Sequence, residues 1–221
     1  MEDIGHLCAH YERSVAKGHY SNEDIDQDKL DDDRTNLAPD RNMKQTEYIN
    51  EKISEIMGDR TLRKDAVRMA CWVVNAPRTL PDEMHEEFFK ETYNFLTDRY
   101  GKKSGMGEDV CISCYIHKSE TTEHIHYAFL PVLERSSVDT ATGTVTRTQS
   151  FCAKDLLNRD ELKECQAELG EYLESKGICR KRDILNGQTR KDSNGRAYSV
   201  RELKEQSRNR SRNYSYGRGR F

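Results

Sequence analysis

The chain lacks the long hydrophobic runs that mark a membrane protein. Only 34% of its 221 residues are hydrophobic, 34% are charged, and the mean hydropathy is -0.97. No run approaches the roughly 18 apolar residues of a membrane span. The opening Met1-Glu-Asp-Ile lacks both the basic and the apolar region of a signal peptide. We therefore expect no membrane segment, a cytoplasmic location, and one domain with a modest core and long surface segments.

The chain also lacks a regular framework of cysteines. Its seven cysteines are odd in number and irregularly spaced, which favours reduced thiols over disulfides. Only Cys111 and Cys114 form a CxxC pair. Because they lie in a strand-like run, where side chains three positions apart face opposite ways, we do not expect the pair to bind zinc or to act in redox chemistry.

Charge is divided unevenly along the chain. From Arg180 to the end there are 13 Lys and Arg against 4 Asp and Glu, a net charge of +9, which leaves 23 against 35, or -12, for residues 1–179. Tyrosines and glycines alternate with arginines in the final "SRNRSRNYSYGRGRF". Arginine side chains bind phosphate groups and tyrosine rings stack on bases, so this end is expected to contact nucleic acid. Arg190 and Arg201 are expected among the contacts. The tail is expected to be partly disordered.

Hydrophobic periodicity predicts helices on either side of a group of strands. A loop is expected over residues 19–42, and helices over 44–57, 81–100 and 158–176. Gly101 should close the second helix. The third should begin with Asn158 as its N-cap, Glu161 completing a capping box and Leu162 on its inner face.

Strand-like runs cover residues 66–76, 109–117, 124–133 and 144–151. The second and third flank "KSETTE" and predict a hairpin, and Thr140 to Gly143 mark a further turn. Because the clearest pair is a hairpin, the sheet is expected to be antiparallel. The pattern predicts an α+β fold, an antiparallel sheet with helices packed on one face.

The stretch "HKSETTEHIH" in this hairpin holds three of the seven histidines. His124 and His126 are two apart on a strand, so they share a face, with Ile125 packed beneath. Two imidazoles placed in this way can bind one divalent cation. Glu120 or His117 could complete the ligand set and leave positions open for a substrate oxygen.

A metal near a segment suited to nucleic acid would polarise a phosphodiester, and such chemistry needs a nucleophile. The N-terminal "GHLCAHYERSVAKGHY" offers four candidates. They are His10, Tyr11, His19 and Tyr20. Either residue type can attack phosphorus, and chemistry alone does not choose between them.

These residues resemble the plasmid mobilisation relaxases of the Mob/Pre (MobV) type, whose signature is approximately H-x-D-E-x-T-P-H-x-H. All three histidines and the glutamate match, and Pro131 follows the apolar run. Ser119 and Glu123 stand where the family has aspartate and proline. Further resemblance lies in "HYER", "DRTNL", "RKDAV", "VRELK" and the helix beginning "AKDLLNRDELKECQ".

The resemblance implies an enzyme with an HUH-endonuclease fold, a DNA endonuclease and strand transferase. It would nick one strand at a plasmid origin of transfer, stay joined to the 5′ phosphate through a histidine, and later rejoin the strand. The catalytic domain would cover residues 1–179 and a basic DNA-contacting segment 180–221. The implied cofactor is a divalent metal ion, with Mn or Mg favoured. The implied partner is single-stranded or supercoiled plasmid DNA, with the conjugation coupling machinery as a further candidate.

The family's residue roles carry over by position. His10 would attack phosphorus, Arg13 would assist at phosphate, and Glu12 would orient the histidine or form a surface salt bridge. The metal ligands would be His117, Glu120, His124 and His126. The DNA contacts would be Arg34, Asn36 and Arg63, with Arg190 and Arg201 of the basic end.

The chain departs from the family pattern in two places, and two other functions fit the same residues. Family members have a strand before H-x-E-R, whereas only nine residues precede His10 here. Either the true start lies upstream, or this is a shortened copy whose sheet lacks that first strand. The long coiled-coil extension of the family is also not expected. One rival is a rolling-circle replication initiator with Tyr11 or Tyr20 as nucleophile. The other is a DNA-binding remnant of a relaxase that no longer cuts.

Overall fold

The computed structural model describes residues 4–14, 25–184, 196 and 202. The chain divides into two units, Met1–Ile184 and Leu185–Phe221. Arg190 and Arg201 lie outside the described residues, so the basic DNA-contacting segment from residue 180 stays a prediction. Within the described part of the chain, no helix is both long and apolar enough to cross a membrane.

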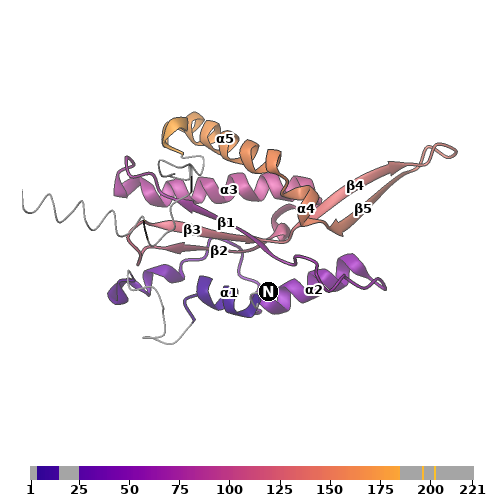
Figure 1. The fold of residues 1–221 in the computed structure, drawn as a ribbon, viewed down its shortest axis with the longest axis horizontal. Helices are drawn as coiled ribbons and strands as arrows, with labels where there is room; N and C mark the ends of the chain where they lie inside the picture. Colours follow the sequence, from indigo (N-terminus) through magenta and orange to yellow (C-terminus); the bar gives the residue numbers. More distant parts are fainter. Residues whose placement is uncertain (1–3, 15–24, 185–195, 197–201, 203–221) are drawn as a thin grey trace, which may run out of the picture. The chain divides into compact units, whose positions relative to one another are not determined.

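The first unit is built around a three-stranded antiparallel sheet with the strand order β1-β3-β2 (Figure 1). The strands are β1 (Ala70–Asn75), β2 (Cys111–His117) and β3 (His124–Phe129). β2 and β3 form the predicted hairpin, with His117 opposite His124. The histidine-rich strand β3 is therefore the middle strand of the sheet.

A second, two-stranded sheet consists of β4 (Val132–Val138) and β5 (Val145–Phe151) and projects beyond the first as a ribbon (Figure 1). The turn predicted near residues 140–143 joins these strands. The sequence predicted one run over 124–133, but β3 ends before Pro131 and β4 begins after it. A proline has no N–H to donate to a strand ladder, which accounts for the break.

Helices cover both faces of the central sheet, not the single face expected. α3 (His85–Ser104) and α5 (Arg159–Ser175) lie on one side, and α1 (Ile4–Tyr11) and α2 (Gln45–Met57) on the other (Figure 1). Every residue of β3 is buried. A strand buried on both faces needs cover on both. The shorter helical elements are α4 (Ala153–Leu156), η1 (Gln27–Lys29), η2 (Asp32–Arg34), η3 (Asp82–Met84), η4 (Gly107–Val110) and η5 (Lys181–Asp183).

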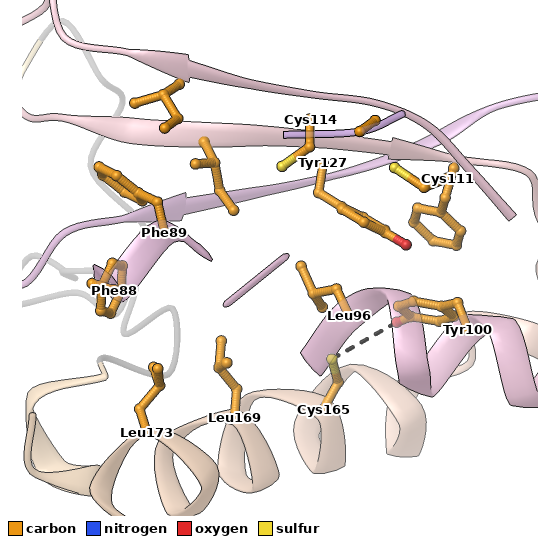
Figure 2. Packing of buried hydrophobic residues seen from close by; sticks show 14 of the residues in the cluster. Phe88, Phe89, Leu96, Tyr100, Cys111, Cys114, Tyr127, Cys165, Leu169 and Leu173 are labelled. Atoms are coloured by element: carbon orange, nitrogen blue, oxygen red, sulfur yellow. Dashed lines mark hydrogen bonds between the residues drawn. The ribbon is translucent and has the colours of Figure 1, made fainter. Parts of the chain in front are cut away.

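The larger core lies between the sheet and the pair α3 and α5. Figure 2 shows Tyr127 of β3 facing Leu96 and Tyr100 of α3, with Leu169 of α5 beyond them. Burying one such side chain contributes about 1.5–3 kcal/mol. Leu162, predicted on the inner face of α5, is instead 43% exposed.

The helix ends differ from the sequence prediction at one glycine. α3 continues past Gly101 to Ser104 and ends at Gly105, which has a left-handed φ of 69°. A Cβ at Gly101 would lie 2.6 Å from the carbonyl oxygen of Gly107, so this glycine is needed for a close backbone approach inside the helix.

The third predicted helix begins as expected. The Asn158 side chain accepts hydrogen bonds from the backbone N–H groups of Asp160 and Glu161. The Glu161 carboxylate does not complete the expected capping box. It forms ion pairs with Arg99 and Lys103 of α3 and so joins the two helices.

Cys111 and Cys114 both face the larger core, contrary to the prediction that they face opposite ways (Figure 2). The pairing of β2 with β3 shifts between Cys111 and Ser113, and this bulge reverses the alternation of side chains. All seven cysteines are free thiols, as predicted. Burial raises the pKa of Cys111 to about 12, which suits an inert core residue.

Candidate active site

The histidine cluster lies on the sheet face that α1 and α2 cover. Ile125 is buried in the larger core on the opposite face, which fixes His124 and His126 on this one, as predicted. His117 sits opposite His124 across the β2–β3 ladder and is fully buried. The hairpin thus brings three imidazoles together from two neighbouring strands.

The three rings lie close together. Ring centroids are 4.5 Å apart for His117 and His126, 4.9 Å for His124 and His126, and 5.2 Å for His117 and His124. The Nδ1 of His124 lies 2.9 Å from the Thr122 carbonyl oxygen, a contact that places the proton of neutral His124 on Nδ1. Its Nε2 lone pair then points toward Nε2 of His126, 3.1 Å away.

The last turn of α1 brings His10 into this cluster. Its ring centroid lies 5.3 Å from that of His126 and 5.6 Å from that of His117. The carbonyl oxygen of Tyr11 lies 3.0 Å from Nε2 of His117, which donates to it. Carbonyls at a helix end have no partner within the helix, so α1 can be anchored to the sheet in this way.

Tyr11 follows His10 and also lies against the histidine cluster. Its ring stacks on His126 at a centroid distance of 4.7 Å and an interplanar angle of 25°. Tyr11 is 5% exposed, whereas His10 is half-buried. Of the two neighbouring candidate nucleophiles, His10 is therefore the more accessible to a substrate.

A buried ion-pair network supports the turn that carries Glu120. Arg13 donates from Nε to Asp33 at 2.8 Å and from Nη2 to Glu120 at 2.7 Å. Asp33 also accepts hydrogen bonds from the backbone N–H groups of Lys118 and Ser119, at 2.5 and 2.8 Å, and from the Ser119 hydroxyl. Three segments far apart in the sequence meet at this one carboxylate.

Sequence reasoning missed Asp33. It selected Arg34 and Asn36 from the same "DRTNL" segment, and the only signal for Asp33 was its place in that segment. Among three consecutive aspartates nothing in the sequence marks the last as buried, yet it is 0% exposed. The Arg13 side chain, expected at phosphate, is 1% exposed and lies between Asp33 and Glu120.

Burial and neighbouring charges control protonation here. Burial, followed by the charges of His117 and His124, lowers the pKa of His126 to about 2, and burial is the main cause that lowers the pKa of His117 to about 4. Burial and the nearby Arg13 lower the pKa of His10. Neutral imidazole is the form that binds metals and attacks electrophiles, so these residues are ready for either role at neutral pH.

The acidic members of the site keep their charge. Burial alone would raise the pKa of Asp33, but hydrogen bonds from Ser119, Lys118 and Arg13 outweigh it and lower the pKa. The pKa of Glu120 is lowered in the same way, because the Arg13 hydrogen bond and the histidines outweigh burial. A carboxylate is therefore available beside the imidazoles.

The residues fit a divalent cation. Two groups have ligand atoms within 4.8 Å of one another: His10, His117 and His126, and His117, Glu120 and His124. The buried Nδ1 of His117 has no hydrogen-bond partner among the described residues. An orphaned lone pair, neutral imidazoles and a carboxylate together form the donor set of a metal site.

Glu12 lies in a different contact from the one expected. Its carboxylate accepts a hydrogen bond of 2.5 Å from the side-chain amide N–H of Gln45. The side-chain oxygen of Gln45 in turn accepts a hydrogen bond of 2.6 Å from the Ser113 hydroxyl. This chain of contacts ties α1 to α2 and β2. Among the described residues, Glu12 makes no hydrogen bond with His10.

The predicted DNA-contacting residues that the structure describes lie at the surface. The side chains of Arg34 and Arg63 are 64% and 81% exposed. The Asn36 side chain accepts a hydrogen bond of 2.8 Å from the backbone N–H of Cys114, which holds the loop of Asn36 against the edge of β2. Within the described ranges, none of the three bonds to the histidines; His19 and Tyr20 lie outside them.

An antiparallel sheet lies between helix layers, with histidines of its neighbouring strands β2 and β3 on one face, and this is the fold of solved relaxase domains. Two crystal structures of the Mn-bound MobM relaxase domain (MOBV; Mob_Pre) bound to plasmid oriT DNA superpose with TM-scores of 0.63 and 0.65. Their identities are 23% and 22%, and each alignment covers 91% or 92% of either chain.

Sequence comparison defines the family. The profile of the family described as plasmid recombination enzyme matches residues 2–200, so the chain belongs to that family. Plasmid recombination enzyme type 1 of Staphylococcus aureus is 27% identical over 164 residues, covering 72% of this chain and 36% of the relative. The Streptococcus agalactiae enzyme is 26% identical over 218 residues, covering 92% and 38%. The chain thus spans a little over a third of the length of these relatives.

Proposed function

We propose that the protein is a metal-dependent mobilisation relaxase, which nicks one DNA strand at a plasmid origin of transfer and later rejoins it. The observation that carries the proposal is the position of His10, a neutral and half-buried histidine whose ring lies 5.3 Å from His126. A nucleophile and a metal site thus share one cluster. The family and the Mn- and DNA-bound state of the similar relaxase structures support the proposal.

The proposed ligands are His117, Glu120, His124 and His126, with Mn²⁺ or Mg²⁺ as the ion. Bound there, the ion supplies charge stabilisation to a scissile phosphate. Arg13 acts through Glu120, which it orients by an ion pair. In the same way Glu12 supports the end of α1 through Gln45.

The proposed bond changes involve His10 alone among the protein groups. A ring nitrogen of neutral His10 attacks phosphorus with its lone pair, and the bond from phosphorus to the 3′ oxygen breaks. The bonding pair leaves with that oxygen, which takes a proton from solvent. The 5′ phosphate stays on His10, and reversal of these steps rejoins the strand, so no nucleotide cofactor is needed.

The proposed substrate is single-stranded or supercoiled plasmid DNA in the cytoplasm. Arg34, Asn36 and Arg63 are placed on an accessible surface, where they could contact phosphates, and Arg190 and Arg201 are proposed to add contacts from the basic end. The conjugation coupling machinery remains a candidate partner.

The test is incubation of the purified protein with Mn²⁺ and single-stranded DNA from the origin of its own plasmid, followed by a denaturing gel. We expect a covalent adduct for the wild type and none for His10→Ala. His6→Ala is the matched control, because His6 is an exposed histidine of the same helix. An adduct that survives His10→Ala but is lost in a Tyr11 or Tyr20 variant would identify a replication initiator. Binding without any cleavage would identify a non-cleaving remnant.

A further inference from the structure

A pocket lies beside the first turns of α1, away from the histidine cluster at the end of that helix. Its lining comes from α1 (Ile4 and Leu7), from α2 (Ile49) and from residues 64–69, the segment before β1. α1 and α2 lie side by side on one face of the sheet (Figure 1). The pocket has a volume of about 570 Å³, and sites for small ligands have about 300–1,000 Å³. It is therefore large enough for part of a ligand to enter.

Positive charge in the pocket lining is not neutralised. Lys64 and Arg68 are exposed, and neither forms an ion pair within the described residues. Among the described residues that line the pocket, the one acid is Asp65, and it is paired with Arg63 at 3.4 Å. The pocket therefore suits a ligand that carries negative charge.

The rest of the lining combines apolar surface with two hydrogen-bonding groups. Ile49 is 1% exposed and Val67 is 50% exposed. Thr46 and Asn50 are one turn apart on α2, so their hydroxyl and amide groups share one face of the helix. Neither side chain makes a hydrogen bond to another described residue. Apolar surface beside an amide that can both donate and accept is suited to a nucleobase that has left its stack.

The edge strand β1 leads from this pocket to the histidine cluster. The Cys71 Sγ lies 3.9 Å from Nδ1 of His126, and Val73 is the register partner of His126, so both face the histidine side of the sheet. Val73 is 52% exposed. Along α1, Ile4 and His10 are six residues apart, a rise of about 9 Å. A stacked strand rises about 3.4 Å per nucleotide, so this length corresponds to about two or three nucleotides.

We infer that the pocket binds one unpaired nucleobase of the nicked strand, about two or three nucleotides from the phosphate that His10 attacks. Asn50 hydrogen-bonds the edge of the base, and Lys64 and Arg68 contact the flanking phosphates. The pocket thereby sets which phosphate reaches the nucleophile. The distance from the attacked phosphate rests on the proposed function, whereas the binding of a base in the pocket does not.

The test is fluorescence anisotropy with labelled single-stranded DNA from the origin of the protein's own plasmid, in which each nucleotide in turn is replaced by an abasic one. His10→Ala protein with Mn²⁺ is used, so that the strand stays uncut. We expect one abasic position to weaken binding about tenfold, because the contacts of one base are lost. Adding Val67→Trp, which fills the pocket from an exposed position, should weaken binding of the intact strand by a similar factor and abolish this dependence. Val138→Trp is the matched control, because Val138 is a 60% exposed valine of β4.

Substitution of the polar groups separates the base contact from the phosphate contacts. Asn50→Ala should reduce the preference for the natural base at that position at least fivefold and leave the salt dependence unchanged. Lys64→Ala and Arg68→Ala should weaken all strands alike, and each should lower the slope of log affinity against log salt by about one. Lys102→Ala, a lysine of α3 that is 75% exposed, should not change this slope. Circular dichroism would establish that each variant is folded.

The inference would be overturned if the abasic effect were the same with and without Val67→Trp, or if Val67→Trp and Val138→Trp had equal effects. If binding depends on the pocket but the protein with His10 intact cuts no DNA, the proposed function fails and the base site stands. If that protein cuts the DNA and no abasic position depends on the pocket, the inference fails alone.

Discussion

The Nε atom of Arg13 lies 2.8 Å from Oδ2 of Asp33, and both side chains are almost completely buried. Arg13, two residues after the end of α1, has a φ of 51°, which is outside helical geometry. The second arm of the guanidinium reaches Glu120 at 2.7 Å. The two ion pairs of Arg13 therefore connect the end of the helix that carries His10 to the segment of Asp33 and the turn of Glu120.

Asp33→Asn should destabilise the fold by about 3 kcal/mol, because removing one charge of a buried pair leaves the other poorly compensated. The measurement is the free energy of unfolding from urea titration. Asp31→Asn is the control, since Asp31 is 79% exposed beside Arg34 and should change the value by less than about 0.5 kcal/mol. Equal effects of the two substitutions would contradict the role given to Asp33.

Tyr11→Phe should keep the covalent DNA adduct. The phenyl ring preserves the stacking on His126, and the backbone carbonyl that accepts from His117 is unchanged. The adduct yield on a denaturing gel, relative to wild type, is the measurement, and we expect a change of less than about tenfold, since no transition-state contact is lost. Complete loss of the adduct would transfer the nucleophile role from His10 to Tyr11.

Gly101→Ala should destabilise the protein, although alanine normally stabilises a helix interior by up to about 1 kcal/mol over glycine. The added Cβ would lie 2.6 Å from the Gly107 carbonyl oxygen, which is backbone and cannot rotate away. The expected cost is about 1–3 kcal/mol in the free energy of unfolding. A gain in stability would mean that the turn after α3 shifts freely.

Glu161→Gln should make the free energy of unfolding depend less on pH in the acidic range. Burial alone would raise the pKa of Glu161, but Arg99 and Lys103 outweigh it and lower the pKa below the ordinary value of 4.5. The folded carboxylate therefore stabilises the protein fully above its unfolded pKa, and this stability is lost as the pH falls through the lower folded pKa.

The measurement is the urea midpoint of wild type and variant at a series of pH values from neutral to acidic. The difference between them should be largest near neutral pH and shrink in acid. Glu168→Gln is the control, because Glu168 also pairs with Arg99 but is 52% exposed, so solvent screens it. A difference between wild type and Glu161→Gln that does not vary with pH would mean that the charge of Glu161 is not what stabilises the helix pair.

Local sequence patterns predicted the parts of this protein that depend on near neighbours. The hairpin, the Asn158 cap and the shared face of His124 and His126 follow from spacings of two or three residues, because strand alternation and helix capping are local effects. The histidine-rich hairpin and the "HYER" segment were sufficient to indicate the family, which the profile match confirms. The assignment of particular catalytic and DNA-contacting residues by that resemblance stays a prediction.

Tertiary structure decided what depends on contacts between distant segments. The bulge that turns Cys111 and Cys114 to one side, and the backbone contact that places Gly101 inside a helix, arise only when two elements meet. The burial of Asp33 is of the same kind, because its donors come from residues 13, 118 and 119. The sequence by itself determined that imidazoles would gather on one strand. Only the packing of α1 against that strand determined that His10 joins them, because the energy of burying a helix face depends on the whole sheet and not on the residues around His10.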